Sequence, residues 1–309
     1  MFDSINPELR TTIFPVPFNA LTIYGSRIVL PLGNRLMLPV KGVRKSHFIF
    51  EQEGFTPMKV LVLEPENCRE EMPLLIDVHG GAFAYPVAHS QIFLASLYCL
   101  KAGCKVFMPD YPLAPQAIYP TALHVLMAFY RYVFDHQKQL GIEPGKIALA
   151  GDSAGGNLAA LMTLHAQKEG LPLPCGLMLI YPALDATMST ESMKKYRIAP
   201  IWDGKNNQKL WNFYCPNPSL RKEASPLLWP IHTPFPATYV ETTEFDCLHD
   251  EGVLFARKLK EAGIPVELND TKGTYHGYDI HDHSSIALYN TAKRIRFLRR
   301  IFADPQNGK

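Results

Sequence analysis

The sequence has no marked excess of charge of either sign. Its 31 Lys and Arg residues against 29 Asp and Glu residues leave a formal net charge of +2 over 309 residues. Neither sign is gathered into long blocks, so the chain lacks the electrostatic signature of a protein that binds nucleic acid or an anionic membrane. We therefore expect no nucleic-acid partner and no membrane partner.

Long hydrophobic runs and paired cysteines are also missing. The longest apolar candidate, residues 92–100, is well short of the roughly 18 residues that a membrane-spanning helix needs. The first residues lack the basic start and unbroken apolar stretch of a secretory signal, although a mature chain that has lost its signal stays an alternative. Six cysteines without Cys-x-x-Cys spacing argue against a disulfide framework and a zinc site. These absences predict a cytoplasmic protein with reduced thiols.

What the chain does contain is an alternation of short apolar runs and helical patterns from about residue 58 onward. This alternation is typical of βαβ units and predicts an α/β fold with a mostly parallel central sheet flanked by helices. Helices are expected around residues 122–133, 158–165, 255–262 and 288–302. The predicted strands are residues 58–63, 73–78, 105–109, 146–150, 176–181, 238–241 and 266–268.

Two segments interrupt the alternation. Residues 1 to about 55 are rich in Pro and turn signals, and about 185–232 gather aromatic residues among polar ones. We expect one domain over residues 1–309 in which both segments form a cap, or lid, over a ligand pocket. The alternative is that the aromatic residues anchor a satellite core.

The strongest chemical signal is the segment Gly151–Gly155, which reads GDSAG directly after a predicted strand and before a predicted helix. A nucleophilic serine needs a sharp strand-to-helix turn, and the flanking glycines give the backbone the clearance for it. This context predicts that Ser153 is a nucleophile. The alternative is a surface serine in a Gly-rich turn.

A second signal, His79–Phe83 (HGGAF), follows another predicted strand. A loop of small residues can bring backbone N–H groups close to a reacting carbonyl, where they stabilise a developing oxyanion. We assign Gly80, Gly81, Ala82 and Ala154 to this oxyanion hole. Gly80 shapes the turn, and the other three are the expected N–H donors. Taken alone, the segment is equally consistent with an ordinary turn.

A nucleophilic serine also requires an imidazole base and a carboxylate that orients it. His276 lies in a Gly-flanked loop after the last predicted strand, and Asp246 follows the preceding strand. The order Ser153, Asp246, His276 is that of an α/β-hydrolase. Asp250 and Glu244 are the alternatives for the acid. The only other His pair of interest, His281 and His283, has no further ligands nearby, and we expect no metal.

These segments resemble the hormone-sensitive-lipase-like branch of the α/β-hydrolases, the bacterial family IV carboxylesterases, over roughly residues 58–300. His79–Phe83 is similar to the family's HGGG loop, residues 110–115 (DYPLAP) to its DYRLAPE segment, and residues 151–156 read GDSAGG. Residues 246–252 are similar to the family's DPLRDEG, whose first Asp is the triad acid. The resemblance implies the α/β-hydrolase fold, and it implies that a homodimer through the sheet edge or the last helix is an option.

The chain departs from the family pattern at several positions. Ala82 stands in place of the last Gly of HGGG, where an added methyl group disfavours a positive φ. Pro112, Gln116, Cys247 and His249 replace the family's usual Arg, Glu, Pro and Arg. The supporting salt bridges of the family are therefore not expected around these loops.

The sequence predicts a serine hydrolase without cofactor or metal that cleaves small carboxylic esters, with short acyl chains, through an acyl-enzyme. Activity should rise with pH through roughly 6 to 8, because the base must be neutral and an unperturbed histidine titrates near about 6.5. The same triad also suits a deacetylase, thioesterase or amidase. A non-catalytic ligand-binding protein, like the plant hormone receptors that resemble this family, is a further alternative.

Overall fold

The computed structural model of the protein describes residues 2–10, 17–36 and 40–304. Its centre is an eight-stranded sheet in the order β1-β2-β4-β3-β5-β6-β7-β8. β1 and β2, and β2 and β4, pair antiparallel, and every later pair is parallel. The strands are β1 (Val43–Phe50), β2 (Met58–Pro65), β3 (Met72–Val78), β4 (Lys105–Pro109), β5 (Ile142–Asp152), β6 (Leu177–Ile180), β7 (Thr238–Phe245) and β8 (Val266–Tyr275).

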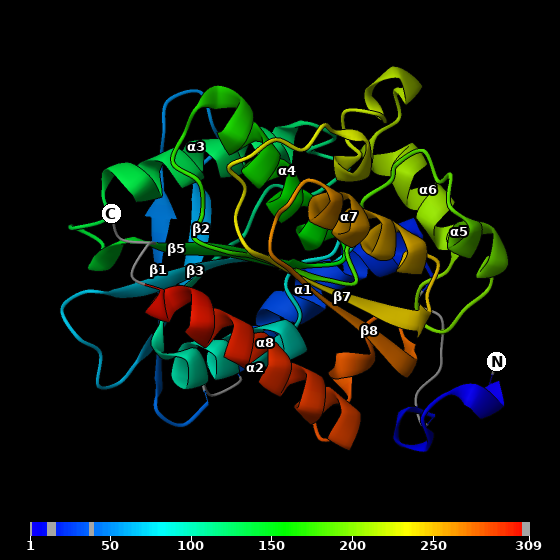
Figure 1. Ribbon diagram of the computed structural model, residues 1–309, viewed down its shortest axis with the longest axis horizontal. Helices are drawn as coiled ribbons and strands as arrows, with labels where there is room; N and C mark the ends of the chain where they lie inside the picture. The colour runs from blue at the N-terminus through cyan, green and yellow to red at the C-terminus, as the bar shows by residue number, and fades with distance from the viewer. Residues whose placement is uncertain (1, 11–16, 37–39, 305–309) are drawn as a thin grey trace.

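Helices cover both faces of this sheet (Figure 1). α2 and α8 lie on one face, and α3, α4 and α7 lie on the other. The α-helices are α1 (Ala20–Leu36), α2 (His89–Tyr98), α3 (Thr121–Asp135), α4 (Ala154–Glu169), α5 (Glu191–Lys195), α6 (Gly204–Tyr214), α7 (His249–Glu261) and α8 (Ser285–Ala303). Short helical turns include η3 (Cys99–Gly103) and η6 (Tyr278–Ile280). The predicted α/β fold with a mostly parallel sheet is confirmed.

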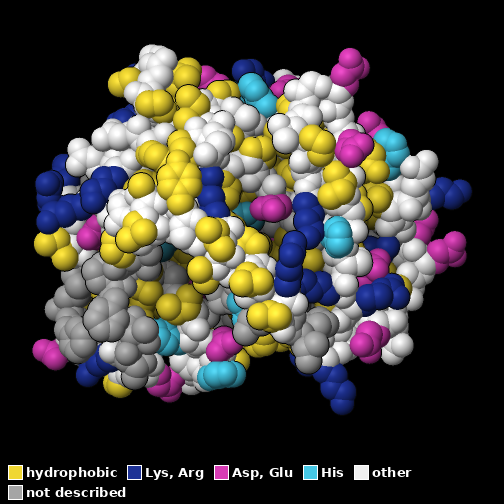
Figure 2. Space-filling model, turned by 180° about the vertical axis from the view of Figure 1, so that it is seen from behind, with side chains coloured by type: hydrophobic (Ala, Val, Ile, Leu, Met, Phe, Trp, Pro, Cys, Tyr) yellow, Lys and Arg dark blue, Asp and Glu magenta, His cyan; other side chains and the backbone are white. Residues whose placement is uncertain are grey.

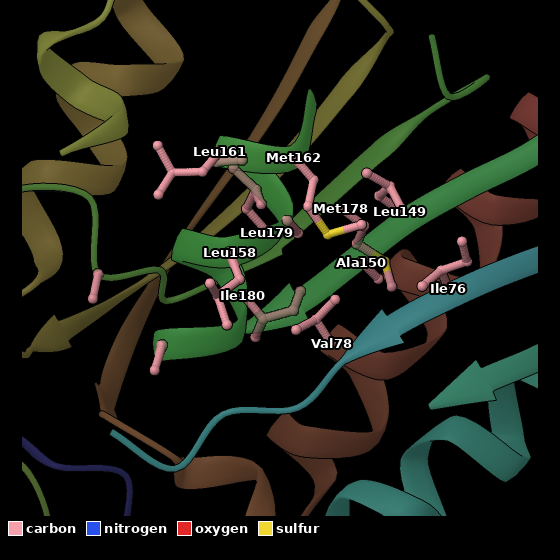
Figure 3. Packing of buried hydrophobic residues seen from close by; sticks show 14 of the residues in the cluster. Ile76, Val78, Leu149, Ala150, Leu158, Leu161, Met162, Met178, Leu179 and Ile180 are labelled. Carbon is pink, nitrogen blue, oxygen red and sulfur yellow. The ribbon is translucent and has the colours of Figure 1, made fainter. Parts of the chain in front are cut away.

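The core beneath the turn at Ser153 shows why the parallel strands are almost wholly apolar. Leu158, Leu161 and Met162 of α4 pack onto strands β3, β5 and β6 (Figure 3). These strands are buried on both faces, so nearly every position along them must be apolar. The packing of α4 against the sheet fixes the ends of these strands, and the loops that carry the site residues follow these ends.

The two segments that interrupt the alternation have different structures. The second one contains α5 and α6. The first contains α1 but also β1, whose eight residues pair with β2 along their full length. The prediction that residues 1 to about 55 all belong to a cap is wrong for residues 43–50, which form an edge strand. Its interior is mostly polar and at least partly exposed, without a regular alternation, so the strand gave little signal in the sequence. Residues 1, 11–16 and 37–39 of that segment lie outside the described residues.

α1 carries several exposed apolar side chains. Leu21 is 83% exposed, and Ile28 and Leu36 are exposed to a similar degree. Hydrophobic side chains, with Lys and Arg side chains between them, are also spread over the rear face of the molecule (Figure 2). No helix in the described part of the chain is both long enough and apolar enough to cross a membrane. Each of the six cysteines is a free thiol.

Candidate active site

Ser153 lies on the sharp turn between β5 and α4. Its backbone angles, φ 53° and ψ −118°, fall in a region that residues other than glycine rarely adopt. The turn is possible because its flanks are glycines: a Cβ on Gly151 would lie 2.3 Å from the carbonyl oxygen of Gly155, and one on Gly155 would lie 1.9 Å from that of Val78. Strain held in place by a packed scaffold is a common property of functional positions. The predicted turn geometry around Ser153 is present.

His276 and Asp246 come within hydrogen-bond distance of the serine in a continuous chain. Ser153 Oγ is 2.9 Å from His276 Nε2, and His276 Nδ1 is 2.8 Å from Asp246 Oδ2. Since a carboxylate can only accept, Nδ1 carries the proton and Nε2 of the neutral ring is left to accept the serine hydroxyl. Ser153, Asp246 and His276 follow β5, β7 and β8, whose carboxyl ends share one edge of the sheet.

Asp246 is fully buried and completely hydrogen-bonded. Besides His276, its carboxylate accepts the Thr243 hydroxyl at 2.8 Å and the Leu248 backbone N–H at 2.9 Å. Such bonds hold a carboxylate in one orientation. The two alternatives for the acid have other partners: Asp250 accepts the Ser192 N–H and contacts His249, and Glu244 accepts the Gly273 N–H.

The loop after β3 places two backbone amides beside the serine. Gly81 and Ala82 donate no hydrogen bond to any described residue, and Ala154 is the first residue of α4, whose N–H has no partner within the helix. Gly80 differs from them because its N–H donates to Asp152 Oδ1 at 2.8 Å. Gly80 therefore anchors the loop, as expected of the residue that shapes the turn.

Ala82 adopts a φ of 52° in spite of its methyl group. This is the left-handed region that disfavours residues other than Gly. Gly81 before it has a φ of 122°, and a Cβ there would lie 2.6 Å from the carbonyl oxygen of Tyr85. The departure from HGGG therefore costs backbone strain at Ala82, while the same exchange one residue earlier would also produce a collision.

Three further residues that the sequence singled out, His79, Gln116 and His281, have structural partners. His79 stacks on Tyr111 at 4.5 Å between ring centroids, and the Tyr111 hydroxyl donates to the His79 carbonyl. Gln116 accepts a hydrogen bond from Arg27 of α1 at 2.5 Å. His281 contacts the Tyr275 hydroxyl. Within the described ranges, no group of three or more His, Cys, Asp or Glu side chains is placed to hold a metal ion.

The serine opens into a cavity of about 730 Å³. One wall comes from α1, including Leu21 and Val29, and another from Ile201 and Trp202 of the segment after β6. The cavity continues past Ser153 along the sheet face that carries α2 and α8. There its lining turns polar, with Asp77, Tyr98, Asp152, Asp279 and Arg294. We call this part of the cavity the polar arm.

Sequence reasoning missed the polar arm. Asp77 interrupts an otherwise apolar strand, and burial, together with the nearby Asp152, raises its pKa to about 7 although Arg294 opposes the shift. A charged residue inside a buried strand was the one signal available. Arg294 lies on α8, and the structure buries it to 1% exposure.

Comparisons with known proteins agree with this geometry. Residues 75–280 match a family model described as alpha/beta hydrolase fold. The chain is 30% identical over 284 residues to carboxylesterase NlhH of Mycobacterium tuberculosis, covering 89% of this chain and 88% of that one. It is 31% identical over 208 residues to an ethyl acetate hydrolase of Pseudomonas putida, covering 66% and 65% of the two chains.

A solved structure described as a bacterial heroin esterase superposes with a TM-score of 0.89 at 28% identity, over 98% of this chain and 99% of that one. The family model spans more than half of the chain and includes the loop at residues 79–83, the turn at Ser153 and the loops that carry Asp246 and His276. These findings bear out the resemblance to the hormone-sensitive-lipase-like enzymes. The chain belongs to the α/β-hydrolase family.

Proposed function

We propose that this protein is a carboxylesterase that hydrolyses small carboxylic esters with Ser153, His276 and Asp246 as its catalytic residues. The observation that carries the proposal is the hydrogen-bonded chain from Ser153 Oγ through His276 to Asp246, with contacts of 2.9 Å and 2.8 Å, at the wall of a large cavity. The esterase and carboxylesterase names of the relatives and of the superposed structure support it.

Each residue has a step that follows from its position. Ser153 Oγ attacks the ester carbonyl while His276 Nε2 takes its proton, and the N–H groups of Gly81, Ala82 and Ala154 stabilise the oxyanion. His276 then protonates the leaving alcohol, and Asp246 stabilises the imidazolium and keeps its orientation. Water activated by His276 releases the acid and regenerates the serine.

The cap is part of this proposal. α1 and the segment around residues 185–232 contribute Leu21, Val29, Ile201 and Trp202 to the cavity wall, so they restrict which substrates reach the serine. Short acyl chains are supported by the ethyl acetate hydrolase among the relatives.

Assembly and location stay predictions. A homodimer is supported by the open edge of β8 and by the exposed Leu288 and Tyr289 of α8, and sedimentation equilibrium measures it. A cytoplasmic location is supported by six unpaired cysteines.

The experiment is a matched panel of p-nitrophenyl esters from acetate to decanoate, with the corresponding anilides, thioesters and acetylated sugars, for wild type and Ser153→Ala. We expect ester hydrolysis that is fastest at short chains and lost in Ser153→Ala. Faster turnover of one of the other classes would reassign the chemistry to an amidase, thioesterase or deacetylase. Wild-type rates no higher than those of the variant on every substrate would contradict the enzymatic proposal and leave a binding role.

A further inference from the structure

Asp77 points toward the polar arm because of its place in the sheet. Side chains alternate between the two faces of a strand, so Asp77 lies opposite to its apolar neighbours Ile76 and Val78. It pairs in register with Ala150 of β5, which in turn pairs with Met178 of β6. All three line the cavity on the side of α2 and α8. The small side chain of Ala150 leaves open space next to the carboxylate.

This carboxylate is buried and has no partner. Asp77 is only 9% exposed, and neither a hydrogen bond nor an ion pair joins it to any described residue. An unpaired buried carboxylate is costly, since burial removes its water without replacing the lost hydrogen bonds. The carboxyl reduces this cost by keeping its proton up to about pH 7, and once ionised it is free to bind a group inside the cavity.

The neighbouring polar groups are already occupied. Arg294 donates to both oxygens of Glu241, to Asp279 at 2.8 Å and to the Tyr98 hydroxyl at 3.2 Å. Asp279 also accepts the Tyr181 hydroxyl at 2.7 Å. Arg294 is thus engaged by two carboxylates and forms no ion pair with Asp77, although its charge still lowers the pKa of that carboxyl.

The arm therefore carries an excess of negative charge. The single cation, Arg294, faces the carboxylates of Glu241 and Asp279, and Asp77 and Asp152 come in addition. Asp152 is held by the Gly80 N–H and by Gln91, both of which are neutral. Low-dielectric walls strengthen the field of such a cluster, so the arm favours a positive group and repels a negative one.

We propose that the polar arm binds a cationic nitrogen carried by the ester substrate, with Asp77 as the residue that recognises it. This deepens the proposed function and rests on it, because the cation belongs to the molecule that Ser153 attacks. Asp77 pairs with Ala150 of β5, and Ala150 precedes Ser153 by three residues. At about 3.3 Å per residue along a strand, this spacing places the cation roughly 10 Å from the reacting carbonyl.

Matched substrates test the charge alone. Each ω-trimethylammonio acyl p-nitrophenyl ester is compared with its carbon isostere, in which a tert-butyl group replaces the ammonium, and with a chain of similar length that ends in a carboxylate. Acetylcholine and 3,3-dimethylbutyl acetate form the corresponding pair for the alcohol side. The quaternary nitrogen keeps its charge at every pH, so the ratio of kcat/KM values within a pair reports on the enzyme.

We expect wild type to prefer the cationic member of at least one pair by about tenfold or more, and to disfavour the carboxylate. Asp77→Asn, which keeps the size of the side chain and removes its charge, should bring that ratio close to one. Asp135→Asn removes the same charge from an exposed position at the end of α3 and should leave the ratio as in wild type.

The preference should also grow between pH 6 and 8 as Asp77 ionises, and this rise should vanish in Asp77→Asn. The titratable and charged groups near Asp77 are Tyr98 from α2, Cys104 before β4, Asp152 from β5, Asp279 from η6 and Arg294 from α8. Titration of these groups changes the catalytic steps equally for the cationic ester and its uncharged isostere. The ratio of their kcat/KM values therefore reports only on how the enzyme binds the positive charge.

A ratio at or below one in every pair, or a ratio that Asp77→Asn does not change, overturns the cation site while ester hydrolysis itself still stands. A failure of the proposed esterase activity can be distinguished from a failure of the cation site. If neither member of a pair is hydrolysed, calorimetric binding of both to Ser153→Ala decides the matter: tighter binding of the cationic member upholds the site, and equal binding overturns it.

Discussion

Two buried aspartates are held in opposite ways near the same cavity: Asp77 lines it, and Asp246 lies behind the lining residue His276. Asp246 follows β7 and accepts hydrogen bonds from His276, Thr243 and Leu248. Asp77 lies within β3, with comparable burial, and accepts none. The first carboxylate is fixed before any substrate arrives. The second has room beside it and no partner, so its environment is completed only when the cavity is occupied.

The difference separates two tasks that a buried carboxylate can have. A group that must orient a catalytic base gains from full hydrogen bonding, which removes alternative orientations. A group that recognises a ligand must keep its bonding capacity free, and the folded protein is less stable for it. Asp246 meets the first requirement and Asp77 meets the second.

Asp246→Asn changes the fully hydrogen-bonded aspartate of the pair and should have the largest effect. The amide cannot hold His276 with its proton on Nδ1, so we expect kcat on p-nitrophenyl butyrate to fall by roughly three to four orders of magnitude. Asp250→Asn, at the nearest alternative acid, should stay within a few-fold of wild type. A loss at Asp250 as large as the one at Asp246 would show that the acid is assigned to the wrong residue.

Arg294→Met tests whether the polar arm depends on its one cation. Glu241 and Asp279 would remain buried without a counter-ion, so the free energy of unfolding in urea should drop by about 3 to 5 kcal/mol. Arg300→Met removes an exposed ion pair with Glu267 and should cost less than about 1 kcal/mol. Equal losses would mean that the buried network contributes no more than a surface pair.

Asp77→Asn tests whether the Asp77 carboxylate is unpaired, through the pH dependence of the free energy of unfolding. The pKa of Asp77 is about 7 in the folded protein, against about 3.9 when unfolded, so the folded state binds the extra proton between these values. Wild type should therefore lose stability relative to the variant as pH rises from about 4 to 7. Above that range the variant should be more stable by up to roughly 3 to 4 kcal/mol.

Urea unfolding of both proteins at pH 4, 6 and 8 measures this difference. If the free energies of unfolding of Asp77→Asn and wild type became more similar as pH rises, the unpartnered state of Asp77 would be contradicted.

Ala82→Gly should have the smallest effect. Glycine relieves the positive φ of 52° but gains freedom in the unfolded chain, so stability should change by less than about 1 kcal/mol. The N–H is retained, and kcat should stay within a few-fold. Gly81→Ala is the contrast, because its Cβ would meet the Tyr85 carbonyl at 2.6 Å. Similar behaviour of the two variants would show that the loop adjusts more freely than its packing indicates.

The sheet and the candidate triad were predictable because each has a local signal. Continuous apolar runs marked the parallel strands, and Gly151 and Gly155 marked the turn that only small residues allow. Asp246 and His276 could be chosen since parallel strands bring their carboxyl ends to one edge. Glu244 and Asp250 share the chain order of Asp246, so the similarity of residues 246–252 to DPLRDEG supported the choice of Asp246. The hydrogen bond to His276 agrees with that choice.

β1 and the polar arm were not predictable in the same way. β1 is stabilised by pairing with β2, and its own side chains are mostly exposed, so no hydrophobic alternation announces it. The arm joins β3, α2 and α8, which are far apart in sequence, and its character depends on which partners each charge finds. Nothing in the sequence separates Arg294 from the other basic residues of α8, whereas in the structure it forms buried ion pairs with Glu241 and Asp279.

The most direct test of the central claim is covalent labelling with diethyl p-nitrophenyl phosphate. Ser153 Oγ should attack phosphorus and expel p-nitrophenolate, which leaves a diethylphosphoryl serine and releases about one equivalent of p-nitrophenol per active site. Peptide mass spectrometry should place the adduct on Ser153, and Ser153→Ala should release none. An adduct on a different residue, or ester hydrolysis that continues undiminished after Ser153 is fully labelled, would contradict the account.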